Sequence, residues 1–300
     1  MDPVVAQSEF AGDGVMLAAD RWDPPSPGAA GGSGVDRKGL VLLLHGGGQT
    51  RHSWRNTGRS LAADGWSAIA LDARGHGDSQ WAPDGDYGID ALVADLTSVI
   101  EGLGEKPVLV GASMGGMTSL IGQGENPDLA RGLVLVDIAP KVETSGTAEI
   151  MAFMRSGLEG FASLDDAAAA IAAYTPNRVR KPNPQGLRKN LRLRDGRWYW
   201  HWDPEFLRVG DEPTRQSDSI VRYERARDAA AAITVPTMLV RGQQSHVVSE
   251  EGAKELLELI PTAKLIDVTG AGHMVAGDDN DVFSGGLKGF LDEDVVAVRR

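Results

Sequence analysis

The chain of 300 residues predicts an α/β fold with a mostly parallel, doubly wound sheet. Three observations support this fold class. Short apolar runs such as residues 40–44 and 133–138 are continuous rather than alternating, as expected for parallel strands buried on both faces. Helix-like stretches separate the runs at short spacing, which implies right-handed crossovers. Finally, residues 108–120 pass from an apolar run through closely spaced glycines into a helix-like stretch.

The predicted elements follow one another with short connections until residue 141, and the strand and helix rhythm resumes near residue 229. In chain order they are an edge strand at 14–22, a Pro- and Gly-rich loop at 23–34, a strand at 40–44, a helix at 53–64, a strand at 66–71, a helix at 89–102, strands at 107–110, 133–138, 236–241 and 263–268, and a terminal helix to about 291.

Composition limits the possible partners. The formal net charge of −12 argues against nucleic acid, because phosphate binding needs a basic surface. The chain has no cysteine, so it forms no disulfide and no Cys-ligated metal site. Its N-terminus lacks the pattern of a signal peptide, and no segment reaches 18 apolar residues. We expect a soluble, cytoplasmic protein that acts on a small molecule without a membrane partner, cofactor or metal ion; the oligomeric state is left open.

Residues 111–115 form the pattern GxSxG around Ser113. In this pattern the serine occupies a strained turn between a strand and a helix, and the glycines remove Cβ atoms that would clash there. Such a turn exposes the serine hydroxyl and places the amide of Met114 at a helix N-terminus, where it can face a developing oxyanion. The alternative is a tight helix-packing turn with an inert serine.

A second glycine-rich loop, residues 45–48, follows the strand at 40–44. Glycines after a central strand let backbone amides approach a ligand, so we expect the amide of Gly47 to supply the second half of an oxyanion hole. A simple turn before a helix is the alternative. His45 is interpreted as structural. In the loop at 72–79, Asp72, Arg74 and His76 are interpreted as side chains that tie the loop to its neighbours rather than as a metal or acid-base cluster.

Five motifs follow one another along the chain: His-Gly-Gly-Gly at 45–48, Asp-x-Arg-Gly-His-Gly-x-Ser at 72–79, Gly-Ala-Ser-Met-Gly at 111–115, Val-Asp-Ile-Ala-Pro at 136–140 and Gly-Ala-Gly-His-Met at 270–274. Their order and spacing resemble the α/β-hydrolase superfamily over essentially the whole chain. Within it, the chain is most similar to capped single-domain esterases, perhydrolases and epoxide-hydrolase-like proteins. The resemblance implies an α/β-hydrolase core at 1–142 and 229–300 with a cap insertion at 143–228.

The resemblance implies that Ser113 is the nucleophile and His273 the general base. The acid departs from the family pattern, because His246 occupies the turn where relatives often carry an aspartate. A neutral imidazole cannot offset the charge of an imidazolium, and a protonated one would repel it. Asp137, at the end of the preceding strand, resembles an alternative acid position of the superfamily. A dyad assisted by water or another carboxylate, and a chain disabled by His246, are the other possibilities.

The predicted cap contains a helix start at Ser163 and a hairpin around 195–196. Because side chains alternate between the two faces of a strand, the tryptophans at 198, 200 and 202 would lie on one face. Such a row of tryptophans is more often a packing surface than the wall of a substrate pocket. His52 and His201 match no motif and are assigned to the surface or the cap. The expected pocket residues are Gly48, Met151, Phe153, Met154 and Trp200.

The leading function is hydrolysis of an ester, lactone or thioester of a small to medium apolar substrate through an acyl-enzyme. Epoxide hydrolases and haloalkane dehalogenases need a carboxylate nucleophile, which Ser113 does not provide. Because of His246, a catalytically impaired or ligand-binding member of the fold remains an alternative, as does a lyase that uses the same triad.

Overall fold

A computed structural model describes residues 5–25, 37–174, 183–208, 215–273 and 281–296. Its main sheet has eight strands in the order β1-β2-β4-β3-β5-β6-β9-β10. Strands β3 to β10 of this sheet are parallel, whereas β2 pairs antiparallel with both β1 and β4. The strands are β1 (Val5–Ala11), β2 (Met16–Trp22), β3 (Gly39–Leu44), β4 (Trp66–Leu71), β5 (Val108–Ala112), β6 (Gly132–Val136), β9 (Thr237–Gly242) and β10 (Lys264–Val268).

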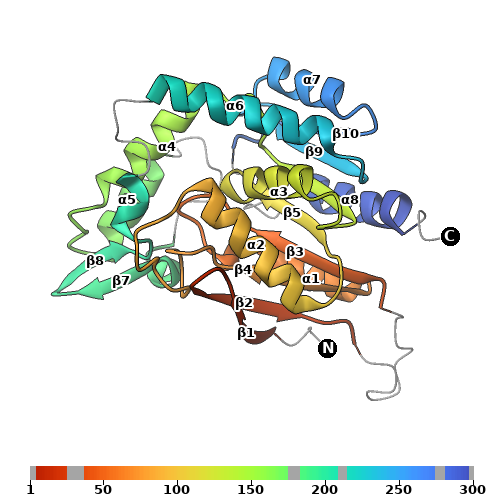
Figure 1. The fold of residues 1–300 in the computed structure, drawn as a ribbon. Coiled ribbons are helices and arrows are strands. Elements are labelled where there is room, and N and C mark those ends of the chain that lie inside the picture. The colour runs from red at the N-terminus through yellow and green to blue at the C-terminus, as the bar shows by residue number, and fades with distance from the viewer. Residues whose placement is uncertain (1–4, 26–36, 175–182, 209–214, 274–280, 297–300) are drawn as a thin grey trace.

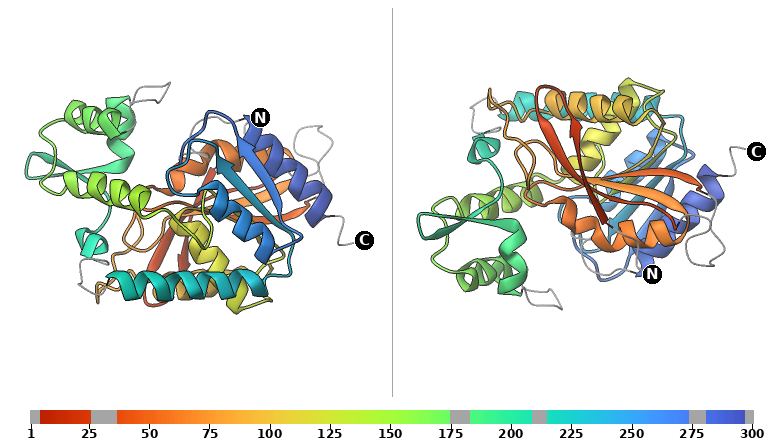
Figure 2. Two further views of the ribbon diagram at one scale, coloured as in Figure 1. Left: turned by 90° about the horizontal axis from the view of Figure 1, so that it is seen from above. Right: turned by 90° about the horizontal axis from the view of Figure 1, so that it is seen from below.

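Helices cover both faces of this sheet (Figures 1 and 2). Alternate residues of each central strand join different cores: Leu40 and Leu42 pack with one set of helices, and Val41 and Leu43 with the other. Burial on both faces explains why these strands are continuously apolar. One set is α2 (Ile89–Leu103), α3 (Met114–Glu125), α6 (Arg215–Ala232) and α7 (Glu250–Leu259); the other is α1 (Arg55–Ala63), preceded by the 3₁₀ helix η1 (Arg51–Trp54), and α8 (Asp281–Phe290), followed by the π-helix η4 (Leu291–Val295).

The predicted fold class is confirmed, but the predicted edge position of the strand at 14–22 is wrong. The missed strand β1 forms the edge, and β2 lies between β1 and β4. A tight turn joins β1 to β2, with Gly14 in the left-handed region at φ 75° and a hydrogen bond of 2.8 Å from Gly12 N to Val15 O. The polar sequence of β1 and its largely exposed side chains gave it little of the apolar signal that marks the buried strands.

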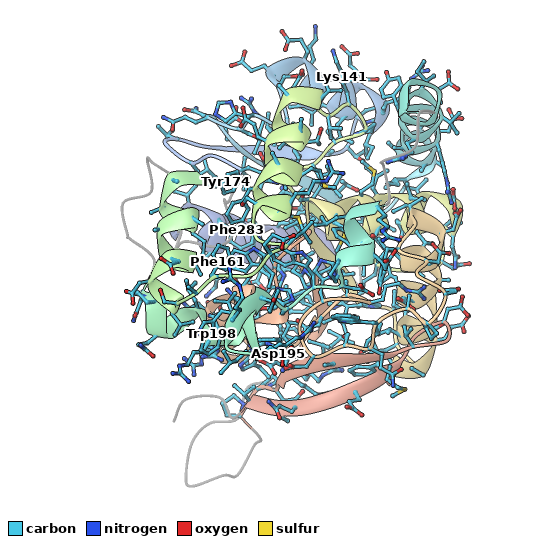
Figure 3. All side chains as sticks on the ribbon, turned by 90° about the vertical axis from the view of Figure 1, so that its left-hand side faces the viewer. Lys141, Phe161, Tyr174, Asp195, Trp198 and Phe283 are labelled. Atoms are coloured by element: carbon cyan, nitrogen blue, oxygen red, sulfur yellow. The ribbon has the colours of Figure 1, made fainter. Side chains whose placement is uncertain are left out.

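The segment between β6 and β9 covers one end of the sheet (Figures 1 and 3). It has a small apolar core of its own around Met154, Trp200 and Trp202. The predicted hairpin is confirmed, with Asp195 and Gly196 both at positive φ in its turn. Its elements are α4 (Thr144–Ser156), α5 (Leu164–Tyr174), η2 (Pro184–Asn190), β7 (Leu191–Arg194), β8 (Arg197–Trp200) and η3 (Pro204–Arg208).

The helix start predicted at Ser163 is also confirmed, because its hydroxyl accepts a hydrogen bond from the amide of Asp166 at 3.1 Å. Helix α6 falls mainly within the predicted cap, yet its residues Ala226 and Ala229 pack in the core beside α3. The division of the chain at residue 228 therefore stays a prediction. In the described part of the chain, no helix combines the length and apolar character needed to cross a bilayer.

The contact between α3 and α6 depends on a glycine and gives a test of the packing. A Cβ atom on Gly124 would lie 2.3 Å from the backbone oxygen of Ala229, so the helices would have to separate. We expect Gly124→Ala to lower the free energy of unfolding by about 1–3 kcal/mol despite the better helix propensity of alanine. In α2, a Cβ atom on Gly102 would have no other atom within 4 Å, so Gly102→Ala should raise the free energy of unfolding by up to about 1 kcal/mol. Urea unfolding of both variants measures the difference. An equal rise in the free energy of unfolding in the two variants would show that Gly124 is not required for the contact between α3 and α6.

Candidate active site

Ser113 lies in a strained turn between β5 and α3. Its backbone, at φ 47° and ψ −113°, has a conformation that residues other than glycine rarely adopt. The two flanking glycines make the turn possible: a Cβ on Gly111 would lie 2.4 Å from Gly115 O, and a Cβ on Gly115 would lie 2.6 Å from Leu44 Cβ. The turn therefore has the local structure that the GxSxG pattern predicts.

Asp137 follows β6 and accepts hydrogen bonds from three separate groups. Its Oδ2 lies 2.7 Å from His273 Nδ1 and 2.5 Å from the Ser245 hydroxyl, and its Oδ1 accepts from Gly242 N at 3.0 Å. The carboxylate is fully buried, while the His273 side chain is 18% exposed. With Nδ1 donating to Asp137, His273 keeps Nε2 as the nitrogen that is free to accept a proton.

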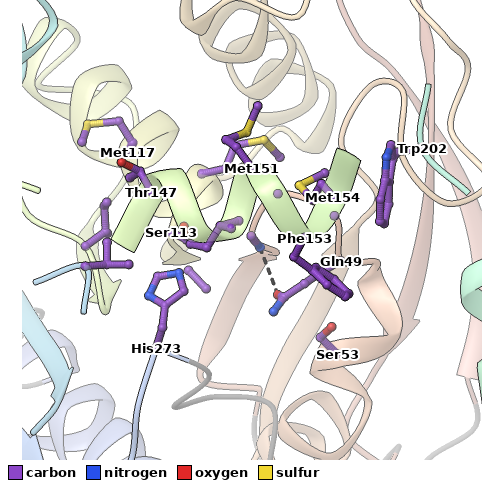
Figure 4. A pocket seen from close by; sticks show the side chains of 18 of the residues that line it. Gln49, Ser53, Ser113, Met117, Thr147, Met151, Phe153, Met154, Trp202 and His273 are labelled. Carbon is purple, nitrogen blue, oxygen red and sulfur yellow. Dashed lines mark hydrogen bonds between the residues drawn. The ribbon is translucent and has the colours of Figure 1, made fainter. Parts of the chain in front are cut away.

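Ser113 and His273 line the same cavity (Figure 4). No hydrogen bond joins the Ser113 hydroxyl to His273 within the described residues. Catalytic hydrogen bonds are often long in unliganded enzymes and tighten once substrate is bound. The two side chains and the buried carboxylate thus come from three different strand ends, those of β5, β6 and β10.

His246 is exposed in the turn after β9 and does not line the cavity. Its backbone packs against α4, where a Cβ on Gly146 would lie 2.0 Å from His246 O. The neighbour that reaches the site is Ser245, through its hydrogen bond to Asp137. Sequence reasoning missed Ser245; its only signal was its position in the turn where relatives often carry the acid.

Two backbone amides at the cavity remain available to a substrate. Among the described residues, those of Gly47 and Met114 have no hydrogen-bond partner, whereas the amide of Gly48 donates to His76 Nε2 at 3.1 Å. Gly47 also lies close to η3, since a Cβ added to it would be 3.5 Å from the ring of Phe206. The amides assigned to the oxyanion hole are therefore the two that this arrangement leaves unpaired.

Three buried histidines lie in a row behind the glycine-rich loop at residues 45–48, the predicted oxyanion loop. The ring of His76 is 5.3 Å from that of His45 and 5.8 Å from that of His201, centroid to centroid. Each ring accepts a backbone N–H from a loop: Ala73 N to His45 Nε2 at 3.0 Å, Gly48 N to His76 Nε2 at 3.1 Å, and Gly77 N to His201 Nδ1 at 2.7 Å.

Burial keeps these rings neutral. It lowers the pKa of His45 to about 4 and, together with the nearby His45, that of His76 to about 3. The pKa of His201 is likewise lowered, first by burial and then by His76. Of the two alternatives for His201, the surface or the cap, the surface is excluded, because His201 is 1% exposed and lies in the segment predicted as the cap. His52 lines the cavity.

The structural interpretation of the loop at 72–79 is supported. Asp72 accepts a hydrogen bond from Arg51 N and pairs with the Arg51 guanidinium, which also contacts Asp20 at 3.0 Å. Arg74 pairs with Asp95 at 2.7 Å. These buried charges are compensated within the scaffold and do not line the cavity. Among the described residues, no three His, Asp or Glu side chains group in a way that could hold a metal ion.

The cavity has a volume of about 1320 Å³. Its wall includes every residue expected there: Gly48, Met151, Phe153, Met154 and Trp200. Trp200 stacks on Trp202, with ring centroids 5.0 Å apart, and both line the cavity. Trp198 does not line it and lies beneath the guanidinium of Arg188, so the predicted stripe is divided between wall and packing.

Comparison with known proteins identifies the family. A family model of the alpha/beta hydrolase fold matches residues 39–279. The chain is 30% identical over 288 residues to esterase Rv0045c of Mycobacterium tuberculosis, an alignment that covers 92% of this chain and 86% of that protein. The chain belongs to the α/β hydrolase family.

Other members of the family agree with this assignment. The sn-1-specific diacylglycerol lipase ABHD11 of Mus musculus is 29% identical over 273 residues, covering 84% of this chain and 80% of the lipase. A crystal structure of the M. tuberculosis esterase superposes with a TM-score of 0.71 at 28% identity, covering 97% and 93% of the two chains. That of E-2-(acetamidomethylene)succinate hydrolase, at 22% identity and a TM-score of 0.78 over 96% and 100%, shows the shared fold. The named relatives support a hydrolase.

The neutral histidines behind the oxyanion loop make stability depend on pH. Because the folded-state pKa values of His45 and His76 lie below the ordinary value of 6.5, the unfolded chain takes up protons first as the pH falls. The stabilisation is fully present above about pH 6.5 and is lost as the pH falls through the folded-state values. The variant His76→Gln keeps an acceptor for Gly48 N but cannot be protonated. We expect its melting temperature to fall less than that of the wild type between pH 7 and pH 4.5.

Calorimetry of the two proteins at matched pH values measures this difference. The control is His246→Gln, which alters an exposed histidine and should follow the wild-type profile. A His76→Gln profile that coincides with the wild type would show that His76 does not carry the effect.

Proposed function

We propose that the chain is a serine hydrolase that cleaves a carboxylic ester, lactone or thioester of a small to medium apolar substrate. The observation that carries this proposal is the 2.7 Å contact between Asp137 Oδ2 and His273 Nδ1 beside a cavity that also contains the Ser113 turn. A serine nucleophile, a histidine base and a buried carboxylate are the three groups that acyl transfer through an acyl-enzyme requires.

In the proposed reaction, Ser113 Oγ attacks the substrate carbonyl while His273 Nε2 takes its proton. The amides of Gly47 and Met114 donate to the resulting oxyanion. The C–O or C–S bond then breaks, and the leaving group takes the proton from His273. Water attacks the acyl-enzyme in the same way, with His273 as base again, and releases the acid and free Ser113. Asp137 holds the tautomer of His273 and stabilises the imidazolium in both steps.

The geometry favours this function over the alternatives. The reason to consider an impaired or ligand-binding protein was His246, but the carboxylate that contacts His273 comes from Asp137 instead. The wall of methionines and aromatic rings fits an apolar substrate portion, and the names of the esterase and lipase relatives are compatible with ester cleavage. An epoxide hydrolase of this family would need a carboxylate where Ser113 stands.

The nucleophile can be tested without knowing the natural substrate. We expect wild-type protein to react with a fluorophosphonate probe and to release a burst of product from an activated acyl ester. Ser113→Ala should abolish both and lower kcat by up to about 10⁶-fold, the loss seen when the serine of a protease triad is removed. Mass spectrometry of the labelled peptide locates the modified residue. Labelling or a burst that survives in folded Ser113→Ala would refute the assignment.

The identity of the acid gives a separate prediction. In a protease triad, replacement of the aspartate by asparagine costs about 10⁴ in kcat, because the histidine is then held in the wrong tautomer. We expect Asp137→Asn to cause a loss of this order with probe labelling slowed in parallel. His246→Ala should retain nearly full activity, since its side chain is outside the cavity. Near-normal activity in Asp137→Asn would refute this assignment, and together with a strong gain in His246→Asp it would place the acid at the turn after β9.

A further inference from the structure

The cavity at Ser113 is lined by charges opposite in sign to the charge of the chain. The whole sequence has 42 acidic and 30 basic residues, but the described residues of the cavity wall include a single carboxylate, Glu255. The basic residues of the wall are Arg55, Lys141, Lys189, Arg222 and Arg225. An anion approaching Ser113 therefore meets a locally favourable field on an otherwise acidic protein.

Two of these cations, Arg55 and Lys189, line the same cavity and have no counter-ion among the described residues. Arg55 is the first residue of α1, and Lys189 lies in η2. In contrast, Arg225 already pairs with Glu125 and Asp90, both at 2.6 Å. Some of the uncompensated positive charge of the wall thus lies where the segment preceding β7 contacts the segment following the oxyanion loop.

The proximity of the two cations has an electrostatic cost. Desolvation lowers the pKa of Lys189, and the charge of Arg55 lowers it further. A bound anion would relieve this repulsion by interacting with both groups. Both residues remain exposed to solvent, so an anion can reach them. The segments that carry them are in contact, since Thr50 Oγ1 donates a hydrogen bond of 3.5 Å to Asn190, which is next to Lys189.

The wall also contains apolar side chains, some of which are deeply buried. Met154 is 2% and Trp202 is 3% exposed, in contrast to the exposed Arg55 and Lys189. Figure 4 shows Met151, Met154, Phe153 and Trp202 around Ser113. The cavity is therefore amphipathic, with an apolar wall beside Ser113 and a cationic pair nearer solvent. Such a cavity matches a molecule that has an apolar portion and a separate anionic end.

We propose that the substrate cleaved at Ser113 carries an anionic group, a carboxylate or a phosphate, and that Arg55 and Lys189 bind it. This proposal rests on the proposed serine hydrolase function and specifies its substrate class. The anion is part of the substrate and does not react; the bond broken is the ester or thioester at Ser113. Carboxylate and phosphate share the chemistry that two cations recognise.

The test compares charged and neutral substrates of equal length. One pair is a p-nitrophenyl hemi-ester of a dicarboxylic acid and its methyl-capped diester; the other is an S-acyl pantetheine 4′-phosphate and the same thioester without phosphate. We expect the wild type to prefer the charged member of at least one pair by about tenfold or more in kcat/KM, mainly through a lower KM. The pair that shows the preference identifies the anion. Added salt should reduce the preference by screening it.

Variants assign the preference to the two residues. Arg55→Gln and Lys189→Gln should each lower the charged-to-neutral ratio of kcat/KM several-fold, and Lys189→Arg should retain most of it. Lys189→Glu should abolish it, because the new carboxylate would pair with Arg55 and leave the pair without net charge. The control is Lys254→Gln on α7, an exposed lysine outside the cavity, which changes the net charge equally and should leave the ratio unaltered.

The outcomes separate the two proposals. If the wild type hydrolyses the neutral esters, labels with the fluorophosphonate probe and shows no preference for either charged substrate, the anion site is refuted and the serine hydrolase remains. A preference that survives Arg55→Gln with Lys189→Gln would also refute this site. If no substrate is cleaved and Ser113 does not label, the serine hydrolase function itself fails, and this inference fails with it.

Discussion

Burial of the Asp137 carboxylate is the constraint on which the arrangement of the site depends. An anion with no exposure to water must be compensated by donors, since an unpaired buried charge is strongly destabilising. The donors come from the turn after β9, through Gly242 and Ser245, and from the loop after β10, through His273. One carboxylate thus fixes two loops that are distant in sequence and brings His273 to the cavity.

The same region holds two strained backbones at adjacent strand ends. Ser113 and Asp137 both have positive φ, at 47° and 50°. Residues in such conformations persist only where their surroundings determine them strongly. Here the pairing continues past the strands: Ser113 N donates to Val136 O at 3.1 Å, and Asp137 N donates to Val240 O at 2.7 Å. The central strands therefore support the strain that projects both side chains, the candidate nucleophile and acid, beyond the sheet edge.

Features that depend on neighbouring residues in the chain could be predicted from the sequence. Features that depend on contacts between residues far apart in the chain could not. Continuous apolar runs identify the buried strands, and glycine spacing identifies the Ser113 turn, because each depends on neighbouring residues. The polar strand β1 is stabilised by pairing with β2 and has little apolar signal of its own. The choice between Asp137 and His246 stayed open because it depends on which of them reaches His273. The proximity of Arg55 and Lys189, 134 positions apart, likewise arises only from folding.

The choice of neutral histidines behind the oxyanion loop has an electrostatic reason. A carboxylate could also accept the amide of Gly48, but it would place a negative charge beside the position where the oxyanion forms and oppose it. A neutral imidazole accepts the same amide without adding that charge. Burial keeps His45 and His76 in this form at neutral pH. His201 and Phe206 extend the same packing into the segment that covers the cavity. Uncharged ring contacts thus connect the loop that would stabilise the transition state to the wall that would receive the substrate.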